Sequence, residues 1–129
     1  MKKSTGLLLF IVILLVLPQS ISAAKKFDPV GKWTFNVPDA PYGYNNGKFE
    51  VKLVDDLFNV SINFDGMDYS FKGEMVFFEK DKFSFSLFLE GVDVFMDFTF
   101  FDKNTMSGLA SYFEGELNMS AKRVVDDDK

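Results

Sequence analysis

The chain has 129 residues, a formal net charge of −5, and neither cysteine nor histidine. Without cysteine there are no disulfides, no thiol nucleophile and no lipid-carrying cysteine, and without histidine the commonest general base and zinc ligand are missing. Nucleic acid is not expected as a partner, because an acidic surface without a Lys/Arg cluster repels phosphate. Every phenylalanine except Phe10 follows residue 24, so aromatic side chains are expected to supply most of the core.

Residues 1–24 have the three-part pattern of a secretory signal peptide. Lys2 and Lys3 give a positive start, residues 7–17 are uninterruptedly apolar, and Ser22-Ala23-Ala24 suits signal peptidase. A single membrane anchor is the alternative, but the apolar run is well short of the ~20 residues that span a bilayer. We therefore expect cleavage near Ala24, a secreted or periplasmic protein, and no membrane span in the mature chain.

Residues 25–123 are predicted to form one all-β domain, because short runs alternate apolar and polar residues between turn signals. Asp65-Gly66 and Glu114-Gly115 are typical hairpin turns, whereas two prolines exclude a regular ladder from the long connection 38–47. No run shows helical periodicity. The expected strands cover 31–37, 48–54, 58–64, 69–72, 74–78, 83–90, 93–101, 106–112 and 116–123.

The short connections predict an antiparallel up-and-down meander of about eight strands. We expect it to close into a single β-barrel, because an open sheet would expose one apolar face and two unpaired edges. A two-sheet β-sandwich is the alternative. Residues 124–129, which include three consecutive aspartates, are expected to be a disordered acidic tail.

The chain's only tryptophan and only arginine lie near the two ends of the predicted domain. Gly31-Lys32-Trp33 and Arg123 resemble the G-x-W opening and the last-strand basic residue of calycin and lipocalin barrels. The resemblance implies that Trp33 closes the barrel floor and that the guanidinium of Arg123 stacks on it. Because no helix precedes the last strand, the chain looks closer to helix-free avidin-like barrels, or to small secreted bacterial domains of lipocalin-like shape.

One functional hypothesis is a binding protein for a small apolar or amphipathic ligand, since a barrel of this size can hold one. Flexible thioethers would line the pocket, and phenols of the long connection would meet the polar end of the ligand. The alternative is an interior filled by side chains. The candidate ligand-binding residues are Tyr42, Tyr44, Met75, Met96, Met106 and Met119.

A second hypothesis is an interaction module that forms a homodimer or binds a protein partner. By alternation Phe88, Phe95 and Phe101 face outward, and an exposed aromatic patch marks such an interface. The alternative is that a bulge near Phe77-Phe78 or Phe100-Phe101 turns the rings inward.

An enzyme is the least supported class. The carboxylate pairs Glu114/Glu116 and Asp93/Asp97 lie at a turn or on the polar side of a strand, where a solvated charge is expected. We therefore predict no catalytic residue, no cofactor and no metal site.

Overall fold

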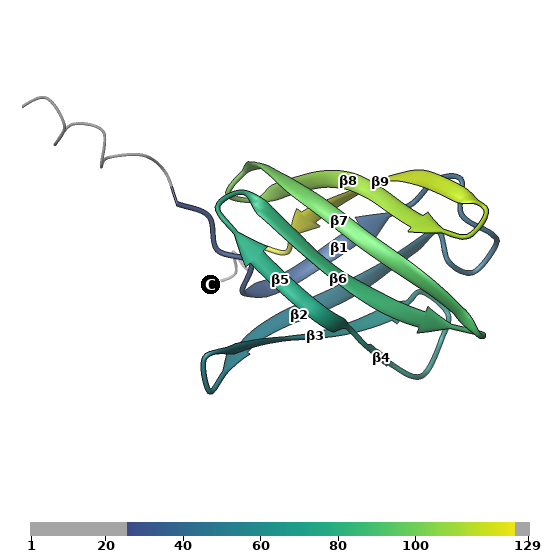
Figure 1. Cartoon of the computed structure of the whole chain (residues 1–129), viewed down its shortest axis with the longest axis horizontal. Coiled ribbons are helices and arrows are strands. Elements are labelled where there is room, and N and C mark those ends of the chain that lie inside the picture. The colour runs from purple at the N-terminus through teal and green to yellow at the C-terminus, as the bar shows by residue number, and fades with distance from the viewer. Residues whose placement is uncertain (1–25, 126–129) are drawn as a thin grey trace, which may run out of the picture.

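A computed structural model describes residues 26–125 (Figure 1), and that part of the chain forms nine strands and no helix. The predicted signal peptide and residues 126–129 of the predicted tail lie outside the described residues. The strands are β1 (Gly31–Asn36), β2 (Asn46–Val54), β3 (Leu57–Phe64), β4 (Phe71–Lys72), β5 (Glu74–Glu79), β6 (Lys82–Leu89), β7 (Val92–Asp102), β8 (Thr105–Tyr112) and β9 (Gly115–Arg123).

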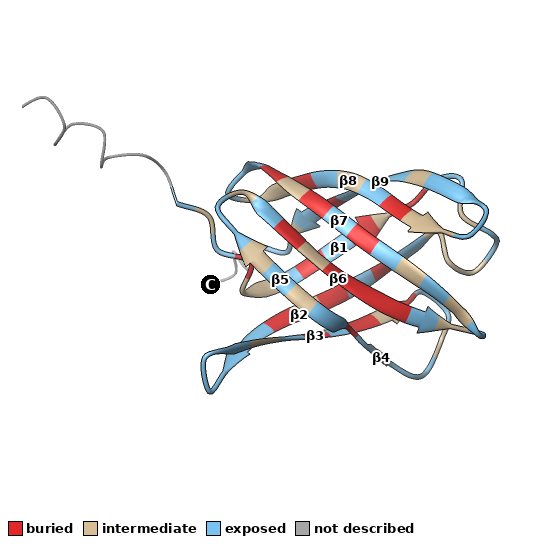
Figure 2. Cartoon of the chain, in the orientation of Figure 1, coloured by how far each residue is buried: buried red, intermediate tan, exposed pale blue. Residues whose placement is uncertain are grey.

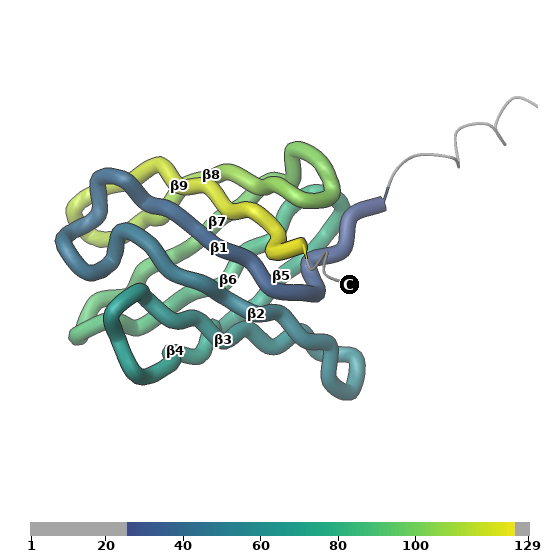
Figure 3. The backbone as a smooth tube through the Cα atoms, turned by 180° about the vertical axis from the view of Figure 1, so that it is seen from behind, coloured from purple at the N-terminus to yellow at the C-terminus, as the bar shows by residue number. Residues whose placement is uncertain are grey.

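The strands form one antiparallel sheet in the order β4-β3-β2-β1-β9-β8-β7-β6-β5. Every pair joins chain neighbours except β1 and β9, which bring the first and last strands together. The two ends of this order, β4 and β5, are consecutive in the chain, so the sheet curls round into a nearly closed barrel. Figures 1 and 3 show its two sides, with β5, β6 and β7 on one and β9, β1 and β2 on the other. The predicted up-and-down barrel is confirmed over the sandwich.

β4 and β5 are separate strands because the chain crosses between the two edges of the sheet at Gly73. Its N–H donates to the carbonyl of Val60, 2.9 Å away on β3. A Cβ at this position would lie 2.8 Å from the Val60 Cβ and 3.2 Å from the Phe85 Cδ1. Only glycine therefore lets the connection between β4 and β5 pass between the two edges.

Side-chain alternation fills the barrel as the sequence predicts, with buried and exposed residues alternating along the strands (Figure 2). A stack of rings occupies the middle of the interior, where Phe49 lies 5.7 Å from both Phe85 and Phe98 between ring centroids. Aromatic bulk from β2, β6 and β7 thus takes the place that disulfides have in many small secreted domains.

Three details of the strand assignment are corrected. Leu53, which by alternation shares the face of the buried Phe49 and Val51, is exposed near the end of β2, and Tyr69, inside the predicted strand 69–72, is exposed and precedes β4. The ladder is irregular between Glu74 and Phe77, where Met75 adopts a positive φ of 50°. An extra residue of this kind re-aims the neighbouring side chains, which is why Met75 does not follow the expected alternation.

Replacing Gly73 with alanine is expected to lower the free energy of unfolding by about 1–3 kcal/mol, the usual cost of overpacking. The new methyl group must push apart Val60 and Phe85. Chemical denaturation measures the change, and Lys72→Ala, an exposed neighbour, should stay within about 0.5 kcal/mol of the original protein. If Gly73→Ala and Lys72→Ala were equally stable, the connection between β4 and β5 would not require glycine.

Candidate functional site

One end of the barrel is closed by aromatic packing around Trp33, which is fully buried. The indole stacks against Phe49 at 6.1 Å and meets the edge of Phe100 at 5.8 Å, and Phe27 stacks on Phe100 at 4.8 Å. The indole N–H donates to the carbonyl of Pro29 at 2.9 Å. The segment that precedes β1 thus folds under the barrel. Its Pro29 carbonyl pairs with the indole N–H, the only polar group of the Trp33 side chain.

Arg123 covers this floor from the last strand. Its guanidinium carbon lies 4.4 Å from the centre of the Trp33 ring, a cation–π distance. The guanidinium donates to the carbonyls of Val30 and Asp28, both at 2.7 Å, and to that of Lys103 at 2.9 Å. Its Nε is 3.2 Å from the side-chain oxygen of Asn104. One side chain therefore ties three segments together: the residues before β1, the β7–β8 turn and the end of β9.

The glycine of the G-x-W motif makes room for that guanidinium. Gly31 has a φ of 137°, and a Cβ there would lie 2.7 Å from Nη1 of Arg123. Burial lowers the pKa of Arg123 from its ordinary value, while the charge of Asp28 opposes the effect, and an arginine remains charged under such conditions. Beyond β9, the N–H of Val124 donates to the backbone carbonyl of Lys32 at 2.8 Å. The chain is therefore hydrogen-bonded to β1 one residue past the predicted end of the domain.

We expect Arg123→Lys to lower the free energy of unfolding by about 1–3 kcal/mol, because a lysine cannot reproduce the planar fork of hydrogen bonds. Gly31→Ala should have a cost of similar size, and the two changes should be less than additive, since both displace the same guanidinium. A double-mutant cycle by chemical denaturation measures this, with exposed Lys122→Ala as control. Additive losses would show that Gly31 acts independently of Arg123.

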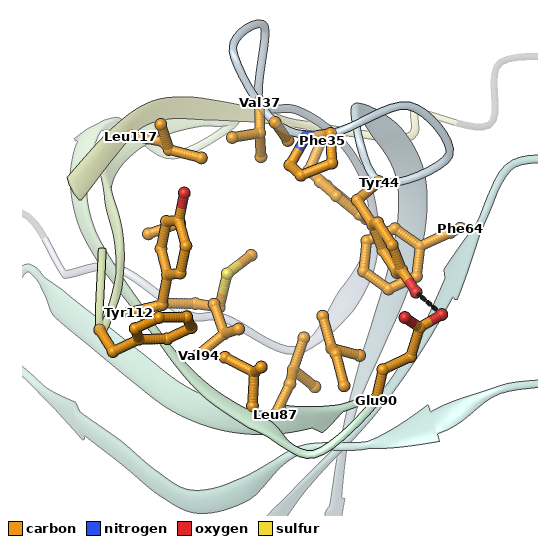
Figure 4. A pocket seen from close by; sticks show the side chains of 16 residues that line it. Phe35, Val37, Tyr44, Phe64, Leu87, Glu90, Val94, Tyr112 and Leu117 are labelled. Atoms are coloured by element: carbon orange, nitrogen blue, oxygen red, sulfur yellow. Dashed lines mark hydrogen bonds between the residues drawn. The ribbon is translucent and has the colours of Figure 1, made fainter. Parts of the chain in front are cut away.

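The opposite end of the barrel is hollow. It contains a cavity of about 270 Å³ whose walls come from β1, β3, β6, β7, β8, β9 and the 37–45 loop (Figure 4). Exposed residues such as Pro41 and Phe113 belong to its lining, so it reaches the surface at this end. The lining residues are Phe35, Val37, Ala40, Pro41, Tyr44, Phe64, Leu87, Leu89, Glu90, Val92, Val94, Met96, Ala110, Tyr112, Phe113 and Leu117.

Only three of these side chains carry an oxygen: Tyr44, Glu90 and Tyr112. The Tyr44 hydroxyl donates to a carboxylate oxygen of Glu90 at 2.7 Å, and its ring meets the edge of Phe64 at 5.0 Å. This hydrogen bond, then burial and the Glu90 charge, raise the pKa of Tyr44 to about 12. The Tyr44 hydroxyl therefore keeps its proton at physiological pH and can donate it to Glu90, as the dashed line in Figure 4 marks.

Glu90 owes its place to the β6–β7 turn, which consists of Glu90 and Gly91 alone. Both have positive φ, 50° and 83°, as in the tight turns that suit the twist of a hairpin. Sequence reasoning missed Glu90, since nothing in the alternation of β6 indicates that this turn lies beside a loop 46 residues earlier in the chain.

The structure brings together two of the six predicted ligand-binding residues, Tyr44 and Met96, which both line the cavity. Met106 and Met119 point inward but are buried in the core outside the lining. Tyr42 is 99% exposed and Met75 is 70% exposed, so neither belongs to it. Of the two loop tyrosines, Tyr44 is the one whose ring packs on Phe64. Met75 is turned outward at the bulge, where its φ is positive.

The three phenylalanines predicted to face outward do so, with exposed fractions of 63% for Phe88, 43% for Phe95 and 83% for Phe101. The ladder is irregular between Phe100 and Asp102, yet Phe100 stays inside and Phe101 outside. Phe95 pairs with Ser86 on β6, which puts Phe88 diagonally next to it. Phe101 lies six residues further along β7, about 20 Å away at ~3.3 Å per residue, so the three do not form one patch.

Within 26–125 no group of three or more His, Cys, Asp or Glu side chains could hold a metal ion. The same part of the chain contains no helix of the length and apolarity that crossing a membrane requires.

Comparison with known proteins gives no assignment. No protein-family model matches the chain, and no curated protein is significantly similar to it. The nearly closed antiparallel barrel, which has no helix within residues 26–125, is by itself consistent with a calycin-like barrel at the level of architecture.

Proposed function

We propose that this protein is a secreted, non-enzymatic binding protein that holds one small apolar or amphipathic ligand in the cavity. The observation that carries the proposal is the contrast between the two ends of the barrel. The Trp33 end is packed and capped, whereas the other end keeps about 270 Å³ of largely apolar space that reaches the surface. Concave apolar sites with a few placed polar groups are the usual form of small-molecule pockets.

The size of the cavity limits the ligand. A dry cavity of ~150 Å³ is enough for a benzene molecule. Scaled to about 270 Å³, the same density of atoms corresponds to a ligand body of about ten carbon atoms. A medium-length alkyl chain or a two-ring aromatic body fits this limit, and a lipid with two long acyl chains does not.

The outward-facing Phe88 and Phe95 favour a second candidate function, a homodimer or a complex with a protein partner through the outer face of β6 and β7. Two adjacent rings are a smaller feature than the interfaces that stable complexes need. Binding in the cavity is therefore the better supported function.

Filling the cavity tests the proposal. Ala110 is buried in its wall, so Ala110→Leu places three additional carbon atoms in the space. We expect titration calorimetry to show that decanol binds to the protein and that Ala110→Leu weakens this binding at least tenfold, with the free energy of unfolding changed by less than about 1.5 kcal/mol. Decanol is used because it is uncharged and carries ten carbons.

Ser111→Leu is the matched control, because it adds a leucine to the next residue of β8, which alternation directs outward. It should leave decanol binding unchanged. Failure of the original protein to bind decanol or any similar apolar probe would count against the proposed function, as would equal binding by both variants. Native mass spectrometry of the secreted protein tests for a retained ligand, and the mass of the mature chain tests cleavage near Ala24.

A further inference from the structure

Glu90 and its partner Tyr44 determine the charge and hydrogen-bonding character of one part of the rim. Tyr112 is the third lining side chain with an oxygen, and its uncharged hydroxyl can donate as well as accept. The single proton of the Tyr44 hydroxyl is donated to Glu90, so the Tyr44 oxygen retains only its capacity to accept. An ionised carboxylate also only accepts. The Tyr44–Glu90 pair therefore offers a ligand acceptors and a negative charge, but no donor.

The charges of the lining have one sign. Glu90 is the sole charged side chain among the described residues that line the cavity, and no lysine or arginine stands beside it there. Glu90 is exposed at the rim, and one carboxylate oxygen carries the hydrogen bond from Tyr44. An anionic head group at this place would be repelled by the carboxylate and would find no cation in the lining. The net charge of −5 also disfavours the approach of an anionic ligand.

Resting on the proposed function, we propose that the cavity selects ligands whose apolar body carries a cationic or N–H donor head group, an alkylammonium being the simplest case. The body fills the space between Phe35, Met96 and Leu117, and the head group binds the carboxylate of Glu90 at the rim. Alcohols with the same body bind more weakly, and carboxylates bind most weakly. The head group of a fatty acid carries the same negative charge as Glu90, so fatty acids are not the preferred ligands of the cavity.

The test compares three probes with the same ten-carbon alkyl body and different heads: decylamine, decanol and undecanoate. At neutral pH the first is a cation and the last an anion, so only the charge of the head group changes sign. We expect titration calorimetry to show decylamine binding about three- to fivefold more tightly than decanol, the upper part of the range of an exposed ion pair, and undecanoate binding more weakly than decanol. Added salt should reduce the preference for decylamine and leave decanol binding nearly unchanged.

Glu90→Gln removes the charge and keeps the size of the side chain. In this variant the affinities for decylamine and decanol should agree within about twofold, and undecanoate should bind more tightly than it does to the original protein. Glu79→Gln is the matched control, because it removes an exposed glutamate beside Phe78, whose ring packs on Phe100 at the floor end. It should retain the preference for decylamine.

The outcomes separate the two proposals. If decanol binds and decylamine binds no more tightly, the cavity is a ligand site but the rim does not select the head group, and the inference is overturned. The same follows if Glu79→Gln removes the preference as completely as Glu90→Gln, since net charge would then be the cause. If none of the three probes binds, the proposed function itself is wrong and the inference falls with it.

Discussion

The contact between Arg123 and Trp33 is the constraint on which the rest of this barrel depends. Among the strands of residues 26–125, β9 and β1 are the only paired ones that are distant in the chain. Trp33 and Arg123 are directly opposite each other in that pairing. The guanidinium lies over the indole and also binds carbonyls before β1 and in the β7–β8 turn. Because one guanidinium holds carbonyls of two separate segments beside the strand that carries it, the arginine fixes the β1–β9 closure of the barrel.

That closure divides the interior into two halves with different roles. The rings of Trp33, Phe49 and Phe100 fill the floor half, and the stack continues through Phe85 and Phe98 in the middle. Beyond this stack the smaller Val37, Val94 and Ala110 stand among larger side chains such as Phe35 and Phe64, and together they surround the cavity. A chain without disulfides thus concentrates its stabilising bulk at one end, and the other end can stay hollow without loss of the core.

The sequence predicts the walls of this barrel much better than its mouth. Alternation with a period of two decides which side of the sheet each residue faces, so the buried positions of β1, β3, β6 and β7 follow directly from the residues. The choice between Tyr42 and Tyr44 depends on the path of an irregular loop, and the outward turn of Met75 depends on a bulge. The Tyr44–Glu90 pair joins a loop to a distant hairpin turn, a proximity that follows from barrel closure and from no local pattern.

The two ends of the barrel differ in packing: the Trp33 end is solid, and the other is empty enough to receive a ligand. A crystal structure determined under xenon pressure tests it most directly, because xenon enters dry apolar cavities of ~150 Å³ or more. We predict a xenon atom in the cavity, among Phe35, Met96 and Leu117, and no xenon around Trp33. Side chains collapsed into the cavity, or xenon bound beside Trp33 and Arg123, would contradict it.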